Sequence, residues 1–110
     1  MISGNHLGIR VTASGNTLFH NSIVGNVVQT GILAGAVNAW DDGYPSGGSY
    51  WSNYVSKYPN VGQIGQSGIW NTPNTLDANN KDNYPIIHSW GTPVSTSYLS
   101  GIGGGKLYVC

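Results

Sequence analysis

The stretch Gly8-Ile9-Arg10-Val11 recurs as Gly31-Ile32-Leu33-Ala34, 23 residues further along the chain. Short triplets such as Ile9-Arg10-Val11 and Ser22-Ile23-Val24 alternate between two faces, which is the period-2 mark of β-strands. A repeat of about 20–50 residues is typical of solenoids, and this spacing suits a turn built from three short strands. Residues 4–38 therefore predict an all-β fold made of right-handed parallel β-helix coils.

Asparagines fall between the expected strands, where the chain must turn, at Asn5, Asn16, Asn21 and Asn26. Asparagine suits these places because it tolerates the left-handed conformation and its amide bonds to nearby backbone groups. An antiparallel β-meander would also have Gly and Asn in the turns between its strands, and it remains the alternative. In the coil hypothesis, alternation directs one set of apolar side chains into a shared interior. This set is Ile9, Val11, Leu18, Ile23 and Ile32.

The chain is almost free of charge. Charged side chains make up 7% of its 110 residues, glutamate is absent, and the net charge is zero. No basic face is available to neutralise a phosphate backbone, so we expect no nucleic-acid partner. Four tryptophans and seven tyrosines provide too much aromatic area for a disordered coil, and they indicate a folded protein. No apolar run approaches the roughly 20 residues of a membrane-spanning helix.

Three segments differ in character. Residues 1–38 are the predicted coils, residues 39–90 form a cap rich in aromatics, glycine and aspartate, and residues 91–110 are a Gly/Ser-rich tail or final strand. An open β-helix end exposes apolar side chains and unpaired strand edges, so a bulky aromatic flap is a sensible cover. The single cysteine, Cys110, excludes an internal disulfide and a paired-cysteine metal site.

Two runs in the predicted cap carry a family resemblance. The first is Asn38-x-Trp40-Asp41-Asp42-Gly43 followed by Ser46-Gly47-Gly48-Ser49-Tyr50-Trp51-Ser52-Asn53-Tyr54, and the second is Leu76-Asp77-Ala78-Asn79-Asn80-Lys81-Asp82-Asn83-Tyr84-Pro85-Ile86. In this order they resemble the C-terminal coils and cap of NosD-like right-handed parallel β-helix repeat proteins of archaeal and bacterial cell surfaces. The resemblance implies a pectate-lyase-like fold and an association with carbohydrate binding, surface layers and, in the namesake, periplasmic copper delivery. Family members often carry an Asp-rich loop between the two runs, whereas residues 60–70 contain no acidic residue.

Catalysis is not expected of this chain. Polysaccharide lyases and hydrolases need an acid and a base that face each other across the bond to be broken. Residues 4–38 contain no Asp or Glu and only one strong cation, Arg10. We therefore predict that the protein is not an enzyme.

The four carboxylates come in two pairs, Asp41 with Asp42 and Asp77 with Asp82. Calcium prefers several oxygen ligands, and Asp77, Asn79 and Asp82 form the candidate calcium site. The competing hypothesis is that these side chains bond to backbone amides of the turns. We favour this structural role, with no cofactor, because Lys81 lies inside the loop. His6 and His20 are 14 residues apart rather than one coil apart, so copper binding is not expected.

Exposed Trp and Tyr side chains stack on sugar rings, and Asn side chains bond to sugar hydroxyls. The candidate carbohydrate-binding residues are Trp40, Tyr44, Tyr50, Trp51, Tyr54 and Trp70. At this aromatic density most of them are expected in the core of the cap, and we predict burial of Trp40 and Trp51 in particular. We also predict that Asp77 and Asp82 accept hydrogen bonds from backbone amides of the cap.

The leading functional hypothesis is a non-enzymatic structural or adhesion element of an extracellular or cell-surface protein, with a periplasmic location as the variant. The alternatives are a carbohydrate-binding module and an accessory part of a polysaccharide-degrading enzyme. The expected partners are copies of the chain itself or the rest of a longer β-helix, and surface polysaccharide. Two coils make a very short solenoid, so we expect the isolated chain to stack on neighbours, with Lys106-Leu107-Tyr108-Val109 adding a strand to an adjacent subunit.

Overall fold

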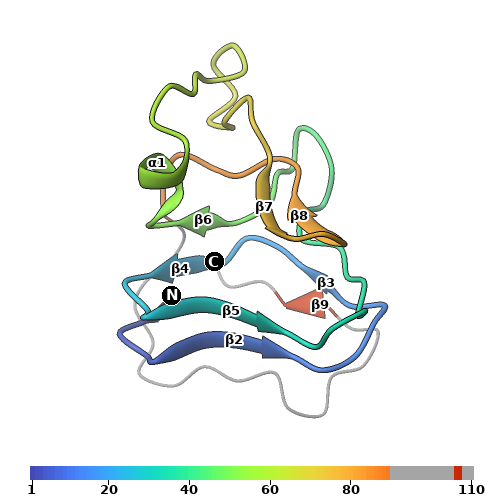
Figure 1. The fold of residues 1–110 in the computed structure, drawn as a ribbon. Helices are drawn as coiled ribbons and strands as arrows, with labels where there is room; N and C mark the ends of the chain where they lie inside the picture. Colours follow the sequence, from blue (N-terminus) through green and yellow to red (C-terminus); the bar gives the residue numbers. More distant parts are fainter. Residues whose placement is uncertain (90–105, 108–110) are drawn as a thin grey trace.

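The computed structural model describes residues 1–89 and 106–107, and this part of the chain is mostly β (Figure 1). Its elements, in order, are β1 (Ile2–Ser3), β2 (Leu7–Val11), β3 (Thr17–Leu18), β4 (Ser22–Val24), β5 (Val28–Ile32), β6 (Tyr50–Trp51), α1 (Tyr54–Lys57), β7 (Asn74–Asp77), β8 (Asn80–Asp82) and β9 (Lys106–Leu107). No helix among the described residues is long and apolar enough to cross a membrane.

The strands pair in four small sheets. One has three parallel strands in the order β1-β4-β6, and the pairs β2-β5 and β3-β9 are also parallel. The fourth sheet is the antiparallel pair β7-β8. In the pairs β1-β4 and β2-β5, Ile2 lies opposite Ile23 and Leu7 opposite Val28, so each partner comes 21 residues later.

The right-handed parallel β-helix predicted from the sequence is wrong. The described strands are two to five residues long, they form separate sheets of two or three strands, and within residues 1–89 and 106–107 they build no closed or coiled β-helix. The chain passes only twice through the series of short strands, first with β1 to β3 and then with β4 and β5, before the cap begins. Two such passes are too few to stack into a continuous coil. The predicted offset of 23 fails too, because Gly31 pairs with Arg10 and not with Gly8.

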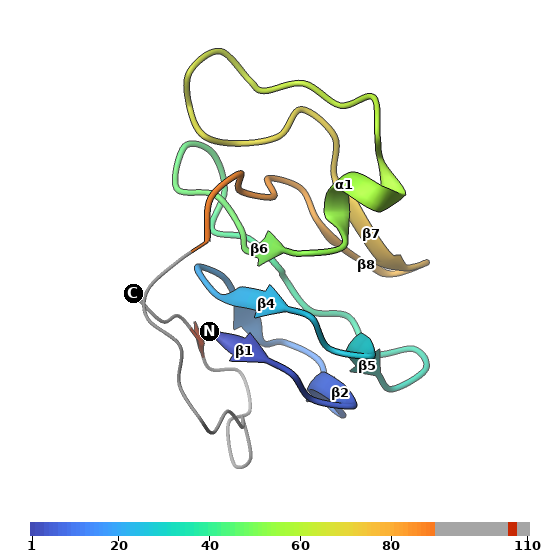
Figure 2. The same cartoon turned by 90° about the vertical axis from the view of Figure 1, so that its left-hand side faces the viewer.

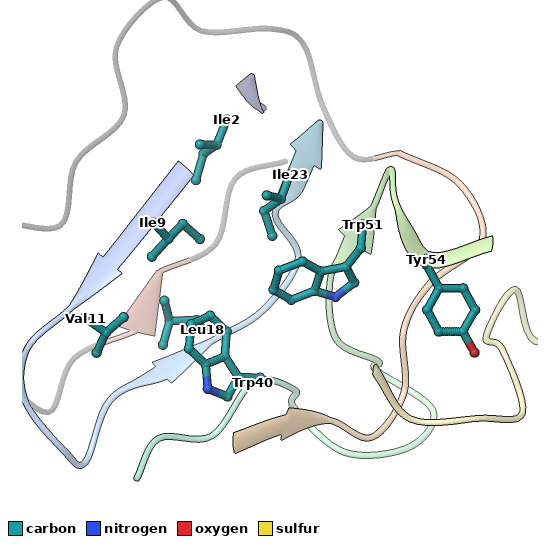
Figure 3. Close-up of a cluster of buried hydrophobic side chains, with 8 residues drawn as sticks. All are labelled: Ile2, Ile9, Val11, Leu18, Ile23, Trp40, Trp51 and Tyr54. Atoms are coloured by element: carbon teal, nitrogen blue, oxygen red, sulfur yellow. The ribbon is translucent and has the colours of Figure 1, made fainter. Parts of the chain in front are cut away.

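The predicted interior is largely confirmed. Ile9, Val11, Leu18 and Ile23 are buried, and Ile32 is half-buried against the same cluster. The cluster continues from the N-terminal strands into the cap through the side chains of Ile2, Trp40, Trp51 and Tyr54 (Figure 3). One apolar core therefore joins the N-terminal strands to the cap, so that neither part buries its apolar side chains alone.

Replacing Ile23 by alanine should lower the free energy of unfolding by about 2–4 kcal/mol, because the side chain is 1% exposed and its loss leaves a cavity. Leu33→Ala is the control, since Leu33 is 56% exposed and should change stability little. Urea unfolding of the two variants measures the difference. Equal destabilisation would show that Ile23 does not belong to the central core.

The cap covers one end of the N-terminal strands (Figure 2). It begins with a loop after Trp40, continues through β6 and α1, and closes with the β7-β8 hairpin. Of the predicted final strand, Lys106 and Leu107 form β9 and pair with Thr17 and Leu18 of the same chain. Tyr108 and Val109, like most of the predicted tail 91–110, lie outside the described residues.

Candidate functional site

Asp82, at the end of β8, is a buried carboxyl group that joins two parts of the cap. Its side chain is fully buried, and its Oδ2 accepts hydrogen bonds from the backbone N–H of Ser49 at 2.8 Å and from Trp51 Nε1 at 2.8 Å. Its Oδ1 accepts a third bond from the N–H of Tyr84 at 3.0 Å. Bonds to a carboxylate are about twice as strong as neutral ones, so Asp82 fixes β6 and the chain after β8 at one point.

Gly48 makes room for this carboxylate. A Cβ added to Gly48 would collide with the carboxyl group of Asp82. The Gly48 N–H also donates to Tyr84 O at 2.8 Å, which holds the two backbones side by side. The glycine is therefore required by the close approach of a side chain and not by a turn.

Burial is the main influence on the charge of Asp82. Removal from water raises the pKa of this carboxyl to about 7, and the hydrogen bonds from Ser49, Trp51 and Tyr84 oppose the rise. Desolvation disfavours the charged form because the interior solvates an ion poorly. The group thus changes its protonation near neutral pH.

A pH dependence of stability follows from this pKa. The unfolded carboxyl has its ordinary pKa near 4, so between about pH 4 and pH 7 the folded state binds more protons than the unfolded state. The contribution of Asp82 is fully present below that range and is lost as the pH rises through 7. We expect the free energy of unfolding to fall from pH 5 to pH 8.

The comparison with Asp82→Asn isolates this effect, because the amide cannot ionise while the side-chain shape is kept. The difference in pH slope between the two proteins, from urea unfolding at each pH, reports Asp82 alone. The Asp77 carboxyl does not interfere, since hydrogen bonds from Asn80 and Asn79 lower its pKa. Identical slopes would contradict the assignment.

Asn80, two residues before Asp82, accepts a hydrogen bond from the indole N–H of Trp40, as Asp82 does from that of Trp51. Its buried Oδ1 accepts from the N–H of Asn38 at 2.9 Å and from Trp40 Nε1 at 3.1 Å. Its Nδ2 donates to Ala36 O at 2.8 Å and to Asp77 Oδ1 at 2.9 Å. The short strand β8 therefore supplies the acceptor for both buried indole N–H groups.

Asn80 also ends a row of asparagines that runs through the molecule. The Asn38 Oδ1 accepts from the N–H and Nδ2 of Asn16, and the Asn80 Oδ1 accepts from the N–H of Asn38. Each acceptor thus serves the asparagine that comes earlier in the sequence. Such side chains replace backbone partners where the chain turns and strand pairing stops.

Asp41 and Asp42 accept hydrogen bonds from nearby groups of the cap. Asp41 Oδ1 accepts from the N–H of Gly43, and its Oδ2 accepts from the N–H and Nδ2 of Asn83. Asp42 Oδ2 accepts from the hydroxyl of Ser46 at 3.0 Å. These contacts hold the first loop of the cap against the chain that follows β8.

The candidate calcium residues are not brought together. Asp77 Oδ1 accepts from the N–H of Asn79 and from Asn80 Nδ2, Asn79 is exposed, and Asp82 is buried elsewhere in the cap. Within residues 1–89, no three His, Cys, Asp or Glu side chains are placed to hold a metal ion. The predicted bonding of Asp77 and Asp82 to backbone amides is confirmed.

Calcium should therefore leave the melting temperature unchanged at millimolar concentration. The physical reason is that the Asp82 oxygens already accept three N–H groups and are closed to solvent. Thermal unfolding with calcium, and with magnesium as the control ion, checks this. A rise with calcium alone would show a site that stabilises the folded state by mass action.

The candidate sugar-binding aromatics fall into three groups. The structure buries Trp40, Trp51 and Tyr54, half-buries Tyr50 and Trp70, and exposes Tyr44. The predicted burial of Trp40 and Trp51 is confirmed, and their rings lie 6.0 Å apart. Burial raises the pKa of Tyr54 to about 12, and its hydroxyl donates to Thr72 O at 2.6 Å. These three rings form core, so the six residues do not make one surface platform.

Sequence reasoning missed a small aromatic surface at the first cap loop. The ring of Tyr44, which is 54% exposed, lies 6.0 Å from the ring of half-buried Tyr84. Asn83 and Asp41 place an amide and a carboxylate beside this pair along the chain. The signal available in the sequence was the Tyr84 that follows Asp82 and Asn83, and only the fold brings it to Tyr44.

No family model, curated protein or solved structure matches this chain. The resemblance to NosD-like proteins therefore stays a prediction from the two sequence runs.

Proposed function

We propose that the chain is a non-enzymatic structural or adhesion element of an extracellular or cell-surface protein. The proposal rests on the hydrogen bonds of the aspartates. All four accept hydrogen bonds from N–H or hydroxyl groups of the chain itself. A glycosidase or lyase instead holds an acid and a base free to face the substrate.

The composition supports a role outside the cell. The surface carries few charges, and the internal polar contacts come from asparagine, serine and aspartate. The two cap runs that resemble cell-surface proteins point the same way. Such a chain would act through its shape and its neutral surface.

Cell-surface exposure is the direct test. Whole cells of the source organism are treated with protease, and the chain is followed with an antibody before and after lysis. Loss of the protein from intact cells, while a cytosolic marker survives, is the expected result. Protection until lysis would overturn the proposed location, and turnover of polysaccharide by the purified chain would overturn the non-enzymatic role.

Carbohydrate recognition is the second candidate, favoured by the exposed Tyr44 next to Tyr84. A tyrosine face can stack on a sugar ring while neighbouring amide and carboxylate groups bond to its hydroxyls. A glycan array probed with the purified chain tests this candidate. Binding should be lost in Tyr44→Ala and kept in Val55→Ala, because Val55 is equally exposed at 53% but lies on α1.

A further inference from the structure

An amine and a carboxamide meet where α1 contacts β7. The Lys57 Nζ donates to Asn74 Oδ1 at 2.6 Å and to Thr75 O at 3.0 Å, and it lies 5.5 Å from the centre of the Tyr58 ring. Since a C=O bond is about 1.2 Å long, the Asn74 Cγ is within about 3.8 Å of Nζ. Reacting atoms in a productive arrangement are about 3–3.5 Å apart. The contact therefore places a nucleophile beside a carbonyl carbon.

The position of the Lys57 amine is unusual for a lysine. A lysine side chain ordinarily keeps its ammonium group in water and covers apolar surface with its stem. Lys57 is exposed as a residue, whereas its Nζ contacts the amide of Asn74, which is 1% exposed. Within the described residues, the hydrogen bonds of Nζ go to an amide and a carbonyl oxygen and to no carboxylate. No charge pair therefore explains why the amine is held here.

Neighbouring contacts fix the amine relative to the amide. The Tyr58 hydroxyl accepts from the N–H of Thr75 at 3.1 Å, and the Tyr54 hydroxyl donates to Thr72 O at 2.6 Å. The buried Tyr54 ring also stacks on that of Trp70 at 5.6 Å. α1 is thus joined to the chain on both sides of the amide. Groups oriented in this way reach effective concentrations of about 10⁵–10⁸ M in the best intramolecular reactions.

A buried carboxyl group lies across the hairpin from this amide. The register of β7 and β8 pairs Asn74 with Asp82, and both side chains are buried, with exposures of 1% and 0%. Residues directly opposite in an antiparallel pair project to the same face, with Cβ atoms about 4.5–5.5 Å apart. The Asp82 Oδ2 accepts two N–H groups, from Ser49 and Trp51, so a proton on this carboxyl belongs on Oδ1. Burial raises the pKa to about 7, which keeps a large share of the group protonated at neutral pH.

We propose that Lys57 and Asn74 form an intramolecular isopeptide bond, with Asp82 transferring the protons. The lysine loses its ammonium proton, its Nζ attacks Cγ of Asn74, and the new Nζ–Cγ bond replaces the Cγ–Nδ2 bond. Asp82 gives its proton to Nδ2, takes one from Nζ and is unchanged at the end. Ammonia leaves and takes up the proton that the lysine lost. The balance needs no further reactant, and the inference does not depend on the proposed function.

The bond would tie α1 to β7 and close residues 57–74 into a loop. α1 has four residues, and a helix of this length is not stable alone in water. The covalent tie would keep it on the cap after the surrounding hydrogen bonds open.

Mass spectrometry of the full chain tests the bond. The folded protein, kept for several days at pH 7, should be lighter than its sequence by one ammonia molecule. Trypsin does not cleave after a lysine whose Nζ is acylated, so digestion of the linked chain should yield residues 11–81 as one peptide. The full mass, with separate peptides 11–57 and 58–81, would overturn the inference. Loss of ammonia with cleavage after Lys57 would overturn it as well, because a succinimide at an asparagine gives that result.

Lys57→Arg identifies the nucleophile, because it keeps the positive charge and cannot form the bond. This variant should keep the full mass. Lys81→Arg is the matched control on β8, since Lys81 is exposed, and it should lose ammonia as the parent chain does. Loss of ammonia in both variants would contradict the assignment of Lys57.

The rate at which the lighter species appears tests the role of Asp82. General acid–base catalysis contributes about 10²–10⁴-fold, so Asp82→Asn should slow the linkage by about 100-fold or more. Asp42→Asn is the control, because Asp42 is exposed and bonds to Ser46, and its rate should match that of the parent chain. Near-UV circular dichroism of the same samples shows that each variant is folded. Equal rates in the two variants would overturn the proton transfer by Asp82.

Discussion

Replacing Gly48 by alanine should lower the free energy of unfolding by about 4 kcal/mol or more, the largest effect expected of any single added methyl group in the described chain. The new Cβ would occupy the place of the Asp82 carboxyl group. Relief of that collision requires Asp82 to leave the N–H groups of Ser49 and Trp51. The substitution thus combines an overpacked core with the loss of a buried acceptor.

Gly31→Ala is the matched control for Gly48→Ala. A Cβ at Gly31 meets the Leu7 Cδ1 at 3.2 Å, which is the far end of a flexible side chain that can move aside. Its effect should stay within about 1 kcal/mol. Urea unfolding followed by tryptophan fluorescence compares the two variants, and similar midpoints would show that Gly48 is not set by its contact with Asp82.

Asp82→Ala should cost about 3–5 kcal/mol, because it leaves two buried N–H groups and one partly buried N–H group without an acceptor. The donors are the backbone amides of Ser49 and Tyr84 and the indole of Trp51. The near-UV circular dichroism of Trp51 should change with the loss of its hydrogen bond. Stability is measured by urea unfolding at pH 7.

The control for Asp82→Ala is Asp42→Ala. Asp42 is exposed and accepts one hydroxyl bond from Ser46, so its loss should change stability by no more than about 0.5 kcal/mol. If the two aspartates proved equivalent, the central place of Asp82 in the cap would be wrong.

Local patterns in the sequence predicted the core well. Alternation placed Ile9, Val11, Leu18 and Ile23 on the buried face, because the period-2 rule depends only on residues that are neighbours in the chain. The density of aromatic residues likewise predicted that Trp40 and Trp51 are core and not surface.

Long-range pairing was predicted poorly. The match of Gly8 with Gly31 rested on the similarity of the two four-residue segments, whereas the sheet pairs Arg10 with Gly31. The strands of the described residues also form no closed coil. Residue identity does not fix register in a strand that is only partly buried, as β5 is along its whole length. The asparagine row was missed, although Asn16 and Asn38 share a spacing of 22 residues that hints at it.

The partners of Asn80 and Asp82 could not be derived from the sequence. Their hydrogen bonds to the two indoles and to the chain before β7 join residues 31 to 44 positions apart, and no local motif specifies which indole meets which side chain. In the sequence, Asn80 and Asp82 are polar residues in a segment rich in Asn and Asp, a composition that is typical of an exposed turn. Only the packing of the cap over β6 gives them a buried environment.

The position of β8 late in the chain has a consequence during synthesis. Trp40 and Trp51 emerge from the ribosome about 30 to 40 residues before Asp82 and Asn80, which hold their N–H groups in the native fold. Until then the nascent chain carries two large indoles that cannot be buried without leaving a donor unpaired. Burial of the two indoles with their N–H groups paired therefore requires residues 80–82, and we expect a chain whose translation stops before them to expose both tryptophans to chaperones and proteases.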